Sequence, residues 1–253
     1  MEVPGTPIFF WLTGSIKDVL PSKKKCFGRL RTSGLSLVDF EITFMIHYTK
    51  KDIIGMDMVQ RLSLINSITG YKPGNLIGTK SESGATNLAI FSSVVHLGSD
   101  PALIAFIMRP MVGERHTMEN ILSTEFYTIN HINTAIIERA HFTSADFPRD
   151  LSEFDRCKLT PQFINSFYAP YVAESRIKIG MSLAETIPLK INNTIMVIGN
   201  VEHIILDSSY QKEDSSIDPI AAGTVCISGI DTYYKTEKLV TLPFVRSDEV
   251  PTF

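Results

Sequence analysis

Apolar and polar residues follow regular patterns along most of the chain beyond residue 44, and these patterns predict mainly strands. Alternating or continuously apolar runs predict six strands, at 75–80, 86–97, 102–109, 125–130, 175–187 and 194–206. Helical spacing predicts helices at 49–64, 117–123 and 133–142, with single helical turns at 151–154 and 218–222. Many strands, few helices and turns at irregular spacing favour an antiparallel barrel with helical insertions over alternating βαβ units.

The first 44 residues lack this order. They carry six basic and four acidic side chains, and the apolar patch at 8–12 precedes the basic cluster. A secretory signal has the opposite order and a longer apolar core. We therefore expect residues 1–44 to be a mobile or non-native N-terminal extension, with Met45 as a candidate start, and residues 45–253 to form one domain.

Composition excludes several classes of protein. The 253 residues are 44% hydrophobic and 20% charged, which is typical of globular proteins. The net charge of −3 and the pI of about 6.1 argue against a nucleic-acid partner. No apolar run approaches the roughly 18–20 residues of a membrane span, so we expect no membrane partner.

Cysteine and histidine spacing gives no sign of a disulfide framework or a metal site. The three cysteines form no CxxC pair, and no two of the six histidines are spaced as HxxxH or HExxH. A reducing, cytoplasmic setting is the default. Rossmann, P-loop and nucleophile-elbow motifs are also missing from the sequence.

Three stretches near the middle of the chain carry the most informative order of residues. They are 76–80 (LIGTK), 84–93 (GATNLAIFSS) and 100–121, which contains Asp-Pro, then Arg-Pro, then Arg-His-Thr. This order resembles the flavin reductase-like family of FMN-binding split barrels, which includes flavoredoxin-like proteins. Further similar segments follow at 127–130, 144–154 and 173–175, so that the resemblance covers about 48–245.

The resemblance implies a fold, a cofactor and an assembly. The fold is mainly β (α+β), a six-stranded antiparallel Greek-key split barrel with attached helices. Family members are usually homodimers that bind flavin near the subunit interface. FMN is the implied cofactor, FAD is less suited, and NAD(P)H is the implied co-substrate.

A dianionic flavin phosphate requires hydroxyls, backbone N–H groups and cations around it. Thr117 stands where a helix is expected to begin, with Arg109 and Arg115 nearby, and it could cap the helix, bind phosphate or do both. His116 and Asn120 complete this predicted group. The family more often has Lys-Asp-Thr where this chain has Arg-His-Thr, which leaves the role of His116 open.

The isoalloxazine ring needs a flat slot with hydrogen-bonding groups at its edge. Ser92 and Ser93 lie on opposite faces of one strand, so at most one of them points at the ring. The resemblance favours Ser92, while the alternative is that both serve neighbouring backbone groups. The ring contacts implied by the resemblance are Thr79, Asn87, Leu88, Ala89, Ser92 and Ser93.

No catalytic side chain is expected, because hydride transfer to flavin N5 is the cofactor's own chemistry. The resemblance implies an NAD(P)H-dependent FMN oxidoreductase that passes electrons to a small acceptor or an acceptor protein. Two alternatives stay open: an FMN-bound electron carrier reduced by another protein, and a flavin-binding domain without turnover. The segments 153–155 and 211–216 either flank the flavin mouth or are solvated loops.

Overall fold

The computed structural model describes residues 45–110 and 115–251. The chain divides into two compact units, Met1–Ile54 and Gly55–Phe253. Helix α1 (Lys50–Gly55) ends at the boundary between them, and the Asp52 carboxylate accepts the Thr49 N–H at its start. The predicted extension 1–44 lies outside the described residues.

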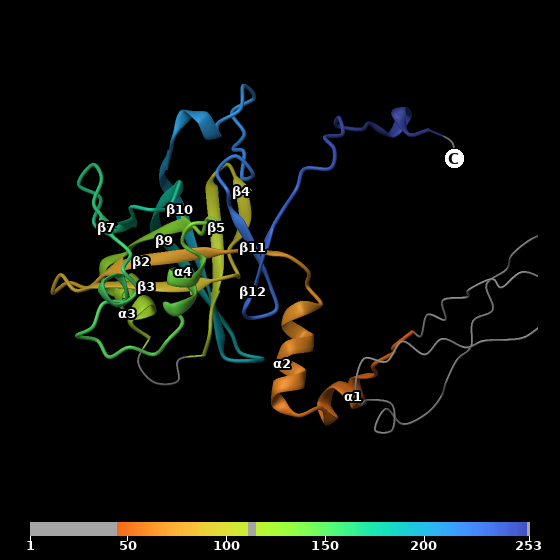
Figure 1. The fold of residues 1–253 in the computed structure, drawn as a ribbon, viewed down its shortest axis with the longest axis horizontal. Helices are drawn as coiled ribbons and strands as arrows, with labels where there is room; N and C mark the ends of the chain where they lie inside the picture. The colour runs from red at the N-terminus through yellow and green to blue at the C-terminus, as the bar shows by residue number, and fades with distance from the viewer. Residues whose placement is uncertain (1–44, 111–114, 252–253) are drawn as a thin grey trace, which may run out of the picture. The chain divides into compact units, whose positions relative to one another are not determined.

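The second unit is built on an antiparallel sheet of seven strands in the order β3-β2-β6-β9-β10-β5-β4 (Figure 1). Its strands are β2 (Asn75–Lys80), β3 (Thr86–Phe91), β4 (Val95–Ser99), β5 (Ala102–Met108), β6 (Phe126–His131), β9 (Ile177–Leu189) and β10 (Thr194–Leu206). The expected mainly β fold is thereby confirmed. The predicted strand 86–97 is two strands, because the chain leaves the sheet at 92–94 and returns at its other edge.

That crossing explains why the sheet curls. Strands β3 and β4 lie at opposite ends of the strand order, yet only residues 92–94 connect them. Three residues span at most about 10–11 Å when fully extended. The two edges of the sheet must therefore come together, as they do in a barrel.

Two smaller sheets and several short helices complete the described elements. The smaller sheets are β1 (Lys72–Pro73), β11 (Val225–Ser228) and β12 (Thr232–Lys235), and β7 (Pro161–Gln162) with β8 (Tyr171–Val172). The helices are α2 (Met58–Ser67), α3 (His116–Thr124), α4 (Ile137–Phe142), α5 (Glu153–Arg156), η2 (Ser208–Tyr210) and η3 (Ser247–Glu249). In the described part of the chain, the helices are too short or too polar to cross a bilayer.

Both faces of β2 are buried, and only Lys80 at its end is partly exposed. Ile77 packs inside the barrel with Phe106, while its neighbour Leu76 packs on the other face with Leu88 and Phe154. The outer cluster lies beneath α4 and α5. These two cores fix β2 and β3 from both sides and hold the polar residues at their ends in place.

Two helices differ from the sequence prediction for local reasons. The expected helix 49–64 is broken into α1 and α2, because the Asp57 side chain caps α2 by accepting the Gln60 N–H at 3.0 Å. The expected helix 133–142 begins only at Ile137. Asn133 instead forms a β-bridge with Thr224 and accepts the Ala135 N–H through its side chain.

Candidate functional site

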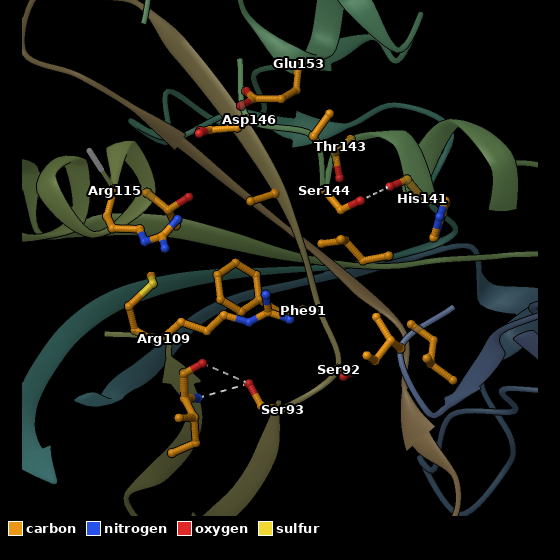
Figure 2. Close-up of a pocket in the computed structure, with 18 of the residues that line it drawn as sticks. Phe91, Ser92, Ser93, Arg109, Arg115, His141, Thr143, Ser144, Asp146 and Glu153 are labelled. Atoms are coloured by element: carbon orange, nitrogen blue, oxygen red, sulfur yellow. Dashed lines mark hydrogen bonds between the residues drawn. The ribbon is translucent and has the colours of Figure 1, made fainter. Parts of the chain in front are cut away.

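A cavity of about 500 Å³ opens where β3, β5 and the start of α3 meet the segment 141–147 and the β11–β12 turn (Figure 2). This size lies within the range of small-molecule and cofactor sites. Eight of the residues predicted to bind the cofactor line it. They are Asn87, Ala89, Ser92, Ser93, Arg109, Arg115, His116 and Thr117.

The other three predicted residues lie behind the cavity wall. Leu88 points into the outer core, as the alternation of a strand requires between Asn87 and Ala89. Thr79 and Asn120 are buried and contact the wall from behind, where the Asn120 amide donates to Thr79 Oγ1 at 3.0 Å. These three side chains support the wall of the cavity without lining it.

Helix α3 begins at His116, one residue earlier than predicted. Arg115 is its N-cap residue, so Thr117 is the second residue of the helix and does not cap it. The Thr117 side chain instead turns inward, is 6% exposed, and accepts a hydrogen bond from the Asn87 amide at 2.9 Å. Its hydroxyl remains part of the cavity wall.

Two arginines give this wall a positive charge. Arg109 and Arg115 both point into the cavity around Phe91 (Figure 2). Arg115 Nε donates to the Pro110 carbonyl at 3.4 Å. Within residues 45–110 and 115–251, neither guanidinium is within ion-pair distance of a carboxylate. Both charges are therefore available to an anionic ligand.

The acidic residue Glu119, four positions after Arg115 in α3, is already engaged. Its carboxylate accepts the Arg115 backbone N–H at 3.1 Å and forms an ion pair with Arg149. The backbone N–H and the Arg149 guanidinium hold the pKa of Glu119 below its usual range. Glu119 thus compensates Arg149 and leaves the Arg115 guanidinium to the cavity.

The two serines after β3 have different roles. Ser93 Oγ donates to the Ile107 carbonyl and accepts the Ile107 N–H, both at 3.1 Å (Figure 2). Ser92 also lines the cavity, but its hydroxyl has no hydrogen-bond partner among the described residues. The geometry therefore leaves Ser92 free for a ligand and commits Ser93 to backbone groups of β5.

Glu153 lines the cavity, and it belongs to the segment 153–155 that was expected either to flank the flavin mouth or to be a solvated loop. It is 7% exposed, and its carboxylate accepts the Leu88 N–H at 2.9 Å. Burial raises the pKa of Glu153, although the Leu88 N–H partly offsets this effect. The 144–154 segment of the resemblance was the available signal. Asp155 and the loop 211–216, in contrast, are exposed and lie outside the cavity lining.

The opposite wall of the cavity contains a hydrogen-bonded histidine–tyrosine pair that sequence patterns did not indicate. His141, at the end of α4, lines the cavity, and its Nδ1 lies 2.9 Å from the hydroxyl of Tyr233 on β12. Burial, with a smaller effect of Asp231, raises the pKa of Tyr233 to about 12. The pair joins two elements that are 92 positions apart in the sequence.

The fold is that of a split barrel, and comparison with known proteins establishes the family. The flavin reductase like domain model matches residues 72–228, which is more than half of the chain. The protein therefore belongs to the flavin reductase-like domain family, which confirms the family predicted from the sequence.

Three relatives show the range of similarity. A split-barrel protein of Shewanella frigidimarina NCIMB 400, provisionally described as a flavin reductase, is 45% identical, with a TM-score of 0.77 over 79% of this chain and 100% of that chain. Flavoredoxin of Desulfovibrio vulgaris (Miyazaki F) is 22% identical, with a TM-score of 0.61 over 69% and 92%. An uncharacterized protein of Aquifex aeolicus (strain VF5) is 25% identical over 62% of this chain and 83% of its own length.

Proposed function

We propose that this protein binds FMN in the cavity and is an oxidoreductase that transfers hydride from NAD(P)H to the flavin. The observation that carries the proposal is the positive wall of the cavity in a flavin reductase-like domain. The Thr117 hydroxyl and the Arg109 and Arg115 guanidinium groups line it, and among the described residues no carboxylate pairs with either arginine. When bound, the flavin accepts and releases the hydride through its own ring system. The residues of the chain bind and orient it.

The polar groups of the cavity suit a single phosphate. In the described chain, the Thr117 hydroxyl hydrogen has no acceptor, and two guanidinium groups stand nearby without carboxylate partners. Hydrogen bonds between these guanidinium groups and a phosphate would be charge-assisted, and such bonds are stronger than those between neutral groups. Because these groups form one cluster, they support FMN, with its single phosphate, over FAD.

The flavin ring would lie along the end of β3. Ala89 and Ser92 line the cavity from this strand, and the Ser92 hydroxyl is available to the ring edge. Phe91 lies between the two arginines in the cavity wall (Figure 2). Glu153 holds the β3 backbone beside the ring through the Leu88 N–H. These residues orient the cofactor, and none is proposed as an acid, base or nucleophile.

An anaerobic visible spectrum tests the proposal. The purified protein is saturated with FMN, and spectra are recorded before and after addition of NADH or NADPH. Loss of the oxidised-flavin band with either nucleotide is expected and identifies the donor. A bound flavin that dithionite bleaches and neither nucleotide bleaches would contradict the reductase. That result would indicate an electron carrier reduced by another protein.

We further propose that the protein is a homodimer, as the family resemblance implies. Helix α2 (Met58–Ser67) contains no buried residue, and its apolar side chains Met58, Val59, Leu62 and Ile65 are all exposed. An isolated ten-residue helix is marginal in water, and most helices are stabilised by packing of an apolar face. A second copy would supply that packing.

A further inference from the structure

Four polar side chains beside the cavity form one buried network. Thr79 on β2 and Asn87 on β3 are directly opposite each other in the antiparallel register. Thr117 and Asn120 lie one turn apart on α3, which covers this end of the two strands. All four residues are at most 6% exposed. The network therefore joins three elements at the edge of the positive wall.

The hydrogen bonds of this network run in defined directions. Asn120 Nδ2 donates to Thr79 Oγ1 at 3.0 Å, and Asn87 Nδ2 donates to the same oxygen at 3.4 Å. Asn87 Nδ2 also donates to Thr117 Oγ1 at 2.9 Å. An amide NH₂ has two hydrogens and a hydroxyl oxygen has two lone pairs. The Asn87 amide hydrogens and the Thr79 lone pairs are thus fully used.

This arrangement determines whether the Thr117 hydroxyl acts as a hydrogen-bond donor or acceptor toward a ligand. Its oxygen already accepts the Asn87 N–H, so the hydroxyl cannot point its own hydrogen toward that amide. No acceptor for this hydrogen exists in the described part of the chain. Because Thr117 lines the cavity, the hydroxyl can donate there, to an acceptor such as an anionic oxygen.

We propose that Thr79 and Asn120 are positioning residues for phosphate recognition, and this inference rests on the proposed function. Neither residue lines the 500 Å³ cavity. Thr79 accepts one hydrogen of the Asn87 amide, and Asn120 holds the Thr79 hydroxyl in place. The other Asn87 amide hydrogen is thereby directed toward Thr117 Oγ1. The network thereby makes Thr117 a hydrogen-bond donor to the ligand and selects flavins that carry a phosphate.

The test compares FMN with riboflavin, which has the same ring system but no phosphate. Dissociation constants for both flavins are measured by flavin fluorescence for the wild-type protein, Thr79→Val, Thr79→Ser and Asn120→Ala. A residue that only supports the fold would change both affinities together. A residue that directs the Thr117 donor changes the ratio of the two.

Thr79→Val and Asn120→Ala are expected to weaken FMN binding about threefold to tenfold, the effect of one hydrogen bond, and to leave riboflavin binding unchanged. Thr79→Ser keeps the hydroxyl and should retain the wild-type ratio. Thr128→Val is the matched control, because Thr128 is equally buried and its hydroxyl donates to the Pro170 carbonyl away from the cavity. It should lower stability without changing the ratio.

The possible outcomes distinguish failure of this inference from failure of the proposed function. If the wild-type protein binds neither flavin, the proposed function fails. If it prefers FMN and Thr79→Val and Asn120→Ala keep that preference, the positioning role is overturned while the proposed function stands. If a variant is too unstable to measure, the other variant decides, because the two residues lie on different elements.

Discussion

At the scale of single residues, burial changes the acid–base behaviour of His131 at the end of β6. Burial lowers its pKa to about 4, and its Nδ1 has no hydrogen-bond partner among the described residues. The unfolded chain binds a proton near pH 6.5 and the folded chain does not until about pH 4. Stability from this residue is therefore complete above pH 6.5 and decreases as the pH falls toward 4.

The expected loss over this range is up to about 3 kcal/mol, at 1.36 kcal/mol per unit of pKa difference. Urea denaturation at pH 7 and pH 4.5 measures it. His131→Gln removes the ionisable group and should flatten the pH dependence relative to the wild-type protein. If the free energy of unfolding changes equally with pH in the two proteins, His131 is not the group responsible.

The two neighbouring serines allow a paired prediction. Ser93→Ala removes the hydroxyl that binds both the N–H and the carbonyl of Ile107. It should lower the free energy of unfolding by about 1–3 kcal/mol. Ser92→Ala should change stability by less than about 0.5 kcal/mol and weaken flavin binding. Thermal denaturation and FMN titration of both variants check this. Similar effects from the two substitutions would contradict the division of roles.

The sequence predicted different orientations for Ser92 and Ser93, but strand alternation alone did not decide which of them contacts the ligand. The predicted placement on opposite faces of one strand is wrong, because both serines follow the end of β3 and both line the cavity. The choice between them depends on Ile107, which lies 14 positions away and reaches Ser93 only because the sheet curls. The Asn87–Thr117 bond likewise joins residues 30 positions apart. A single sequence contains no local signal for such contacts.

At the scale of elements, Gly199 shows how one strand makes room for the barrel core. A Cβ atom there would meet the Tyr127 hydroxyl and lie 2.8 Å from the Ser182 carbonyl oxygen. Gly199→Ala should destabilise the protein by about 1–3 kcal/mol, as overpacking of a core does. Gly229→Ala would be strained by its positive φ, so Gly55→Ala, which has open space, is the better control.

Urea denaturation of the two glycine variants measures this difference. Gly55→Ala is expected to be neutral or slightly stabilising, because alanine favours a helix and nothing lies within 4 Å of its Cβ position. A Gly199→Ala protein as stable as the wild type would show that β10 can shift away from Tyr127.

Two strands were predicted from the sequence with the bounds that the structure shows. The bounds of β2 and β10 agree with prediction, because strong patterns and clear turns define them. Strands β11 and β12 were missed, since each has four residues and too little length to show a period. Helix α5 lies close to the predicted turn at 151–154, and the burial of Glu153 rules out a solvated loop at that residue.

At the scale of the whole molecule, the proposed dimer can be measured directly. Light scattering of the FMN-saturated protein at micromolar concentration should give twice the 28.2 kDa chain mass. Leu62→Glu together with Ile65→Glu, on the exposed face of α2, should shift the mass toward that of the monomer. A wild-type protein of monomer mass would overturn the dimer, whatever the flavin result.

The overall architecture was predictable as a class and unpredictable in its connections. Strand number, the scarcity of helices and the order of short motifs indicated an antiparallel barrel, and the family model confirmed the family. The strand order pairs β6 with β2 and β9, and β10 with β5. These pairings depend on packing between distant segments, which no local period encodes.

The Ser93 contact has a consequence for how the barrel opens. At the seam where the end of β3 meets β5, the Ser93 side chain replaces a neighbouring strand as the partner of the Ile107 amide. Strand β6, by comparison, is paired with strands on both sides. Local opening at the seam then needs only a rotamer change in one serine. Amide hydrogen exchange at Ile107 should therefore outpace exchange in β6, and bound FMN should slow it.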